Sequence, residues 1–255
     1  MREHRTHLIP ALVCLVLTLF LLLPVPQAHA GSPSQIVNGM GSFTVEGRNV
    51  RIDMALPEVA SSRNTVPAVA VLHGASGFGG GTLFYPIVEE LVQEGIAAFI
   101  IHYFDGLNVG NKASPAYFEQ RDRIVGKALE YIARLPEVDG ERIGIYGFSL
   151  GAFQALSRAV DDQRIKAVVA VGGGLSRSID RSRIESMPPT LLLHGARDPI
   201  VPVGRARETA EVLKTVGANY ELQIYDGQAH TLQGSTFDDS LERTSEFFLR
   251  TLKFR

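Results

Sequence analysis

Hydrophobic positions follow two patterns along most of this chain. Short continuous apolar runs are typical of strands that are buried on both faces of a parallel sheet, and apolar residues three or four positions apart predict amphipathic helices. The predicted strands are residues 67–72, 96–101, 143–146, 165–171, 190–193 and 220–225. The predicted helices are residues 86–94, about 114–135, 203–216, one that starts at Ala152, and a last one that carries Leu241, Phe248 and Leu252.

Two apolar stretches, residues 43–46 and 50–56, come before this alternation and flank Gly47-Arg48-Asn49, which predicts a β-hairpin. A hairpin followed by repeated strand and helix predicts an α/β fold, with a mainly parallel sheet and helices on both faces. Only residues 172–189 separate two of the later strands, enough for a loop or one short helix. We therefore expect no large lid, and working groups at the carboxyl ends of the strands.

Charged residues are distributed without a long run of one sign. Arg121-Asp122-Arg123, on the helix of residues 114–135, is interpreted as part of a solvated face. Arg177, Arg181 and Arg183 are interpreted as solvated surface too, with recognition of an anionic substrate as the alternative.

The N-terminus has the features of a secretory signal peptide, residues 1–30. Two arginines precede the apolar run of residues 8–23, and Ala28-His29-Ala30 is a small-x-small triplet, so cleavage is expected after Ala30. The alternative is a membrane anchor, but this run of 16 residues is shorter than the ~20 that span a bilayer. We expect a periplasmic or secreted protein, without stable membrane insertion after cleavage.

Composition then bounds the mature chain, residues 31–255. Cys14 leaves with the signal, so disulfides, a Cys nucleophile and a thiolate metal site are excluded, and no metal or cofactor is expected. Removing residues 1–30 takes away two of the 25 basic and one of the 27 acidic residues and leaves a formal net charge of −3. This balance argues against nucleic acid as a partner. The absence of repeats and linkers favours a single domain, and the oligomeric state is open.

Candidate chemistry is concentrated at Gly147-Phe148-Ser149-Leu150-Gly151, a G-x-S-x-G segment between a predicted strand and a predicted helix. In such a nucleophile elbow the chain reverses within a few residues, which strains the central residue and lifts its side chain out of the sheet. The flanking glycines are needed because a Cβ would collide across the turn. The motif alone is common by chance, but the strand before it and the helix after it supply the required context. Ser149 is therefore the candidate nucleophile.

A serine nucleophile needs a base within hydrogen-bonding reach. The mature chain has four histidines, of which His73, His102 and His194 end predicted strands and are assigned hydrogen-bonded structural roles. His230 follows the last strand and every plausible acid, as the order Ser, acid, His requires in this fold. We therefore predict His230 as the base.

The base in turn needs a carboxylate that orients it. Asp198 lies in the loop after the strand of residues 190–193, from which it can reach the imidazole of His230. Its alternative role is capping of a turn or helix. Glu185 and Asp226 remain alternative acids.

Acyl transfer also needs hydrogen-bond donors for the oxyanion. The backbone N–H of Leu150 is one candidate, and the N–H of Ala75 is the second, with Ser76 as its alternative. The glycine-rich loop that holds Ala75 lacks the Gly-Lys-Ser/Thr of a phosphate loop, and Gly79-Gly80-Gly81 lacks the later glycine of a dinucleotide fingerprint. The candidate pocket residues are Ser76, Phe78, Tyr103, Phe104 and Phe148, with core packing as the alternative for the aromatic ones.

The motif of Ser149, together with His73-Gly74, Asp198-x-x-Val201-Pro202 and His230, resembles the α/β-hydrolase superfamily. The compact chain is similar to its dienelactone hydrolase branch over residues 43–253. Many members of that branch use Cys as nucleophile, and dienelactone-cleaving members place an Arg shortly after the catalytic His. Here the nucleophile is Ser149 and Thr231-Leu232-Gln233-Gly234 follows His230, which argues against dienelactone as the substrate.

The sequence as a whole favours an exported serine hydrolase that cleaves a small or exposed carboxylic ester through an acyl-enzyme, with that small-molecule ester as its partner. A serine peptidase or a lactone hydrolase on the same fold is an alternative. A non-catalytic ligand-binding protein is an alternative of a different class, since fold does not dictate function. The intact set of Ser149, Asp198 and His230 counts against it.

Overall fold

The computed structural model describes residues 37–78, 83–107 and 112–253, which lie within one compact unit, Gly31–Arg255. The predicted signal peptide and Gly79-Gly80-Gly81 lie outside the described residues. No helix in the described ranges is long and apolar enough to cross a membrane.

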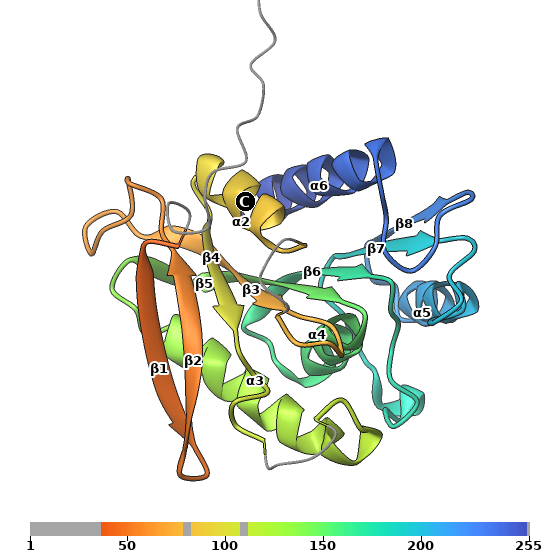
Figure 1. The fold of residues 1–255 in the computed structure, drawn as a ribbon, viewed down its shortest axis with the longest axis horizontal. Helices are drawn as coiled ribbons and strands as arrows, with labels where there is room; N and C mark the ends of the chain where they lie inside the picture. Colours follow the sequence, from red (N-terminus) through yellow and green to blue (C-terminus); the bar gives the residue numbers. More distant parts are fainter. Residues whose placement is uncertain (1–36, 79–82, 108–111, 254–255) are drawn as a thin grey trace, which may run out of the picture. The chain divides into compact units, whose positions relative to one another are not determined.

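The described strands form one sheet of eight, in the order β1-β2-β4-β3-β5-β6-β7-β8 (Figure 1). The strands are β1 Gly39–Val45, β2 Arg48–Ala55, β3 Val66–Leu72, β4 Ala97–Ile101, β5 Val138–Phe148, β6 Ile165–Val171, β7 Thr190–Gly195 and β8 Tyr220–Tyr225. β2 is antiparallel to β1 and β4, and all other neighbours are parallel. The predicted α/β fold, with a mainly parallel sheet and an N-terminal hairpin, is confirmed.

Helices cover both faces of this sheet (Figure 1). They are α2 Tyr85–Gln93, α3 Phe118–Ile132, α4 Leu150–Asp161, α5 Gly204–Thr215 and α6 Ser235–Phe248, with shorter turns η1 Pro115–Tyr117, η2 Arg181–Arg183 and η3 Leu249–Lys253. Side chains of α3, α4 and α5 belong to one apolar cluster, and side chains of α2 and α6 belong to the other. β3 shows why its sequence is continuously apolar, because Ala70 faces the first cluster and Val71 faces the second.

Two predicted boundaries change in the structure. The hairpin turn is Glu46-Gly47, because Arg48 already pairs with Val45. The predicted helix of residues 114–135 is divided into η1 and α3. The segment between β6 and β7 contains η2 and no α-helix, in keeping with the absence of a large lid.

The interpretation of Arg121 as a solvated residue was wrong. Arg121 is 1% exposed, and its Nε donates to Gln154 Oε1 at 3.1 Å. Its Nη1 donates to the carbonyl oxygens of Lys112 at 2.7 Å and Ser114 at 2.9 Å. The position has the spacing of the apolar stripe, since Ile124 follows three residues later on the same buried face. The spacing of Arg121 indicated a buried position, but its charge led to the prediction of a solvated one.

Candidate active site

The nucleophile elbow forms at the centre of the sheet, where β5 ends at Phe148 and α4 begins at Leu150. Ser149 lies between them with φ 54° and ψ −117°, a conformation that non-glycine residues rarely adopt. A Cβ on Gly147 would lie 2.3 Å from the carbonyl oxygen of Gly151, and a Cβ on Gly151 would lie 2.3 Å from that of Leu72. The close packing of backbone on both sides therefore requires both glycines and holds Ser149 in its strained conformation.

The structure brings Ser149, His230 and Asp198 together from three strand ends. His230 Nε2 lies 2.8 Å from Ser149 Oγ, and His230 Nδ1 lies 2.7 Å from Asp198 Oδ2. Ser149 follows β5, Asp198 follows β7 and His230 follows β8, and parallel strands bring their carboxyl ends to one edge of the sheet. Of the candidate acids, Asp198 is the one in contact with His230, while Glu185 lines a separate hollow beside the end of α4.

Asp198 is held by more groups than the sequence suggested. Its side chain is fully buried, and its Oδ1 accepts the backbone N–H of Ile200 and of Val201, each at 2.8 Å. Burial alone would raise the pKa of Asp198, but the hydrogen bonds from His230 and from these backbone N–H groups outweigh it and lower the pKa below its ordinary value. The carboxylate is therefore ionised, as an orienting acid must be.

His194 also reaches this carboxylate, which the sequence did not indicate. Its Nε2 lies 2.8 Å from the carbonyl oxygen of Val201 and 3.2 Å from Asp198 Oδ2. The residue is 1% exposed. The predicted contact of this histidine with loop backbone is present, and the same nitrogen also lies close to the carboxylate of Asp198.

The groups predicted to hold an oxyanion flank Ser149. Leu150 is the first residue of α4, where a backbone N–H has no acceptor within the helix. The loop after β3 passes close by, since a Cβ on Gly74 would lie 3.4 Å from Ser149 Cβ. Ala75 and Ser76 follow in this loop and are exposed. Their role in oxyanion binding stays a prediction.

Of the four predicted aromatic pocket residues, three are partly exposed and one is buried. The ring of Phe148 lies 5.1 Å from that of His230, Phe78 packs on Phe84 at 5.7 Å, and Phe104 lies edge-on to His73 at 4.7 Å. Tyr103 is 0% exposed, and its hydroxyl donates to the carbonyl oxygen of His73 at 2.6 Å. Tyr103 therefore contacts the start of the loop after β3 through this hydrogen bond. Its ring is buried, so its assignment as a pocket wall was wrong.

A cavity of about 470 Å³ lies next to the elbow, beside Leu150. Its walls come from the start of α3, the first turns of α4, the segment after β6 and the residues after Asp198. Most of the lining is apolar, as with Phe118, Phe153 and Ile200. The sequence analysis missed this cavity, because residues that are distant in sequence form it. Of the lining residues, the sequence analysis named Leu150 as an oxyanion donor and gave Arg177 recognition of an anionic substrate as its alternative role.

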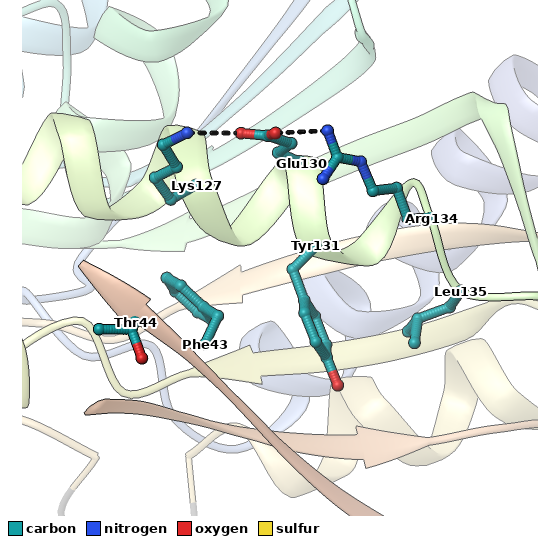
Figure 2. A pocket seen from close by; sticks show the side chains of 7 residues that line it. All are labelled: Phe43, Thr44, Lys127, Glu130, Tyr131, Arg134 and Leu135. Carbon is teal, nitrogen blue, oxygen red and sulfur yellow. Dashed lines mark hydrogen bonds and ion pairs between the residues drawn. The ribbon is translucent and has the colours of Figure 1, made fainter. Parts of the chain in front are cut away.

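A second hollow, of about 320 Å³, lies between β1 and α3 (Figure 2). Its charged groups are paired with one another, since Glu130 accepts from Lys127 at 2.8 Å and from Arg134 at 2.6 Å. Its lining contains no nucleophile with an adjacent base. We therefore assign the candidate active site to the elbow. The described residues also contain no cluster of three or more His, Cys, Asp or Glu that could hold a metal ion.

The sheet order and the strand, turn and helix around Ser149 define this protein as an α/β-hydrolase. The model of the dienelactone hydrolase family matches residues 55–250. The chain therefore belongs to the dienelactone hydrolase family.

Individual relatives are more distant. An acyl-protein thioesterase 1 from Gibberella zeae is 27% identical over 106 residues, a match that covers 39% of this chain and 45% of that protein. A dienelactone hydrolase-like promiscuous phosphotriesterase, P91, from metagenomic libraries has a TM-score of 0.71 at 20% identity and covers 83% of this chain and 98% of its own. An acylaminoacyl peptidase from Pyrococcus horikoshii has a TM-score of 0.68 at 16% identity, and the match covers 84% of this chain and 41% of that one. At these identities, the solved structures support the fold alone.

Proposed function

We propose that this protein is a serine hydrolase that cleaves small or exposed carboxylic esters through an acyl-enzyme. The observation that carries the proposal is the continuous path of contacts from Ser149 Oγ through His230 to Asp198, with distances of 2.8 and 2.7 Å. This is the arrangement in which a base can take the serine proton while a carboxylate holds the imidazole in the correct tautomer. Membership in a family of hydrolases supports it.

In the acylation step, Ser149 Oγ attacks the ester carbonyl carbon while its proton moves to His230 Nε2. The carbonyl oxygen becomes an oxyanion, for which the backbone N–H of Leu150 and of Ala75 are the proposed donors. Collapse of this intermediate breaks the bond between the carbonyl carbon and the alcohol oxygen. His230 returns the proton to the leaving alkoxide, so an alcohol departs and the acyl group stays on Ser149.

In the deacylation step, a water molecule takes the place of the alcohol. His230 accepts a proton from the water as its oxygen bonds to the acyl carbon, and the bond to Ser149 Oγ then breaks. The proton returns to Oγ, which restores the enzyme and releases a carboxylic acid. Asp198 stabilises the imidazolium in both steps through its contact with His230 Nδ1.

The absence of an α-helix between β6 and β7 favours small or exposed esters over substrates that need a closing lid. Thioesters pass through the same acyl-enzyme, and a thioesterase is among the relatives. Thioester and peptide substrates therefore belong beside esters in the same assay, as tests of which leaving group the site accepts.

The proposal is tested with p-nitrophenyl esters of increasing acyl length. We expect Ser149→Ala to lower kcat/KM by several decades, about 10⁴-fold or more, with an unchanged circular dichroism spectrum. Ser186→Ala is the matched control, because Ser186 is exposed and lies away from the elbow, and it should retain activity. A fluorophosphonate should label the wild type and Ser186→Ala and leave Ser149→Ala unlabelled. Folded wild-type protein that neither hydrolyses these esters nor accepts the label would contradict the proposal and favour a ligand-binding role.

We further propose export, with cleavage after Ala30. The support is the basic start, the apolar run of residues 8–23 and the small-x-small triplet before residue 31. N-terminal sequencing of the protein recovered outside the cytoplasm should begin at or near Gly31. A product that begins at Met1 would refute cleavage.

A further inference from the structure

The cavity beside Leu150 adjoins the proposed catalytic groups from two directions. Leu150 directly follows Ser149, and Val201, another lining residue, donates its N–H to Asp198 Oδ1 at 2.8 Å. Ser149 and His230 do not line the cavity themselves, so a ligand that reacts at Ser149 would enter it by extending past Leu150. The volume of about 470 Å³ suits a small-molecule fragment, and the apolar walls suit a hydrocarbon segment.

The charges of this cavity are all of one sign. Its lining contains three arginines, Arg121, Arg177 and Arg205, and no aspartate or glutamate. A mostly apolar cavity with three guanidinium groups and no carboxylate of its own is suited to a ligand that brings the anion.

Arg121 is the most informative of the three, because it is 1% exposed. Its hydrogen-bond partners among the described residues are neutral, namely Gln154 and the carbonyl oxygens of Lys112 and Ser114. These bonds use Nε and Nη1, and Nη2 makes no hydrogen bond within the described residues. A buried charge without a counter-ion is costly. An anion that enters the cavity would offset that cost.

Arg177 and Arg205 differ in how far they are committed to other groups. Arg177 is exposed and makes no ion pair with any described residue. Arg205 donates to Glu208 and to the carbonyl oxygen of Leu175, and its guanidinium lies 5.8 Å from the ring of Phe153. Arg177 is therefore the group with the most freedom to meet a ligand, while Arg205 helps to build the wall.

We propose that this cavity binds the carboxylate-bearing end of an ester substrate, with Arg121 and Arg177 as the anion-binding groups and Phe118, Phe153 and Ile200 against its hydrocarbon segment. The inference rests on the proposed esterase function and names its substrate class. A guanidinium matches a carboxylate with two parallel hydrogen bonds. The substrate class is then an ester in which a free carboxylate is separated from the reacting carbonyl by a short apolar chain.

The carboxylate can belong to the acyl part or to the alcohol part, and two substrate pairs distinguish these. The first pair is mono-p-nitrophenyl adipate and its methyl-capped diester, which place the charge in the acyl part. The second pair is the butyrate ester of 4-(hydroxymethyl)benzoate and the corresponding methyl benzoate. We expect kcat/KM for the anion to exceed that for its neutral partner by about tenfold or more in one of the pairs, since hydrogen bonds to charged groups have this effect.

The preference ratio is then measured in variants. Arg177→Gln and Arg121→Met should each reduce the ratio several-fold, chiefly through KM. Arg207→Gln is the control, because Arg207 is exposed on the same helix as Arg205 and does not line the cavity, and it should keep the wild-type ratio. Because each ratio compares two substrates on one protein, partial loss of folded Arg121→Met cancels, and the exposed Arg177 gives an answer even if Arg121→Met does not fold.

A binding measurement separates this inference from the esterase proposal. Isothermal titration of Ser149→Ala protein with monomethyl adipate should show saturable binding that Arg177→Gln weakens at least several-fold, while dimethyl adipate should bind more weakly. Hydrolysis of both members of each pair at equal rates, with no effect of Arg177→Gln, would overturn the inference and leave the esterase function standing. Absence of all hydrolysis, combined with anion binding that depends on Arg177, would overturn the esterase function and support the binding site.

Discussion

Two turns of this molecule contain the two non-glycine residues with positive φ among the described residues, and the turns differ in origin. Glu46, with φ 50°, lies in the turn between β1 and β2 and is followed by Gly47 with φ 77°. A Cβ on Gly47 would meet no atom within 4 Å. Ser149, with φ 54°, lies between β5 and α4, where a Cβ on either flanking glycine would lie 2.3 Å from backbone oxygen.

The comparison separates a turn determined by its own residues from one determined by its surroundings. A two-residue hairpin with positive φ at both positions follows the twist of the strands it joins, so its geometry is the ordinary choice for such a loop. The elbow has no local preference of that kind. Its conformation persists because the packed backbone around Gly147 and Gly151 leaves no other, and this places the strain at the candidate nucleophile.

Among the substitutions that compare these two turns, the largest effect is expected at the carboxylate that completes the elbow's contacts. Asp198→Asn would present an N–H toward His230 Nδ1 and favour the tautomer whose Nε2 cannot accept the proton of Ser149. We expect kcat/KM for ester hydrolysis to fall about 10³- to 10⁴-fold while the protein stays folded. The hairpin supplies the matched control, because Glu46 contacts Arg123 at 3.1 Å and Gln120 at 3.5 Å on the surface, away from the elbow, and Glu46→Gln should leave the rate unchanged. A Glu46→Gln variant that loses as much activity as Asp198→Asn would contradict the assignment.

Asp198→Asn should also change how the free energy of unfolding depends on pH. Hydrogen bonds outweigh burial and lower the pKa of Asp198 in the folded state. Its ionised form therefore stabilises the protein above the unfolded-state pKa of about 3.9, and this contribution disappears as the pH falls through the lower folded-state pKa. The difference in free energy of unfolding between wild type and Asp198→Asn should be largest near neutral pH and should shrink below about pH 4. Urea denaturation across this range measures it, and a constant difference would be evidence against an ionised Asp198.

The next effect tests whether packing imposes the elbow. Gly151→Ala places a Cβ 2.3 Å from the carbonyl oxygen of Leu72 and 2.7 Å from that of His73, both of them backbone atoms that cannot move independently. We expect a loss of at least about 3 kcal/mol in the free energy of unfolding. Gly47→Ala in the hairpin meets no atom and should lose only the cost of positive φ, about 1 to 2 kcal/mol. Equal losses in urea denaturation would mean that both turns are governed by backbone conformation alone.

A smaller effect isolates the strain at Ser149 itself. Ser149→Gly and Ser149→Ala both remove the hydroxyl, so they differ only in the Cβ that positive φ disfavours. We expect the glycine variant to be more stable than the alanine variant by about 1 to 2 kcal/mol, because the relief of strain exceeds the entropy that glycine loses on folding. Thermal unfolding of the two inactive proteins measures the difference. An alanine variant as stable as the glycine variant would show that the strain at this position does not exceed the entropy that glycine loses on folding.

These contrasts show which parts of the molecule were predictable. Patterns that repeat along the chain predicted the sheet, the helices and the hairpin, because burial on both faces of β3 or one face of α3 acts residue by residue. The elbow motif and the order of Ser149, Asp198 and His230 indicated which strand ends would meet. The contact of His194 with Asp198 was not predictable. It depends on the path of the loop after β7, which brings Asp198 Oδ2 to 3.2 Å from His194 Nε2.

Arg121 marks the limit of the pattern in another way. Its spacing matched the buried stripe of α3, but burial of a guanidinium depends on partners that periodicity does not reveal, here the side chain of Gln154 and the carbonyl oxygens of Lys112 and Ser114. The cavity that Arg121 lines is likewise assembled from α3, α4 and two strand-end loops. Features formed by several distant segments require the tertiary structure.

The smallest predicted effect returns to the hairpin. If its geometry follows from local preference, improving that preference should stabilise it without any new contact. Glu46→Asn creates Asn-Gly, the pair most compatible with positive φ at both positions. It gives up an exposed ion pair with Arg123 and a long hydrogen bond from Gln120, which contribute little. We expect a gain of about 0.5 kcal/mol, a rise of about 1 to 2 °C in the unfolding midpoint. Glu46→Ala is the control, because it also removes the ion pair but keeps the cost of positive φ. Equal midpoints for the two variants would mean that the pairing of β1 with β2, and not the turn, determines this geometry.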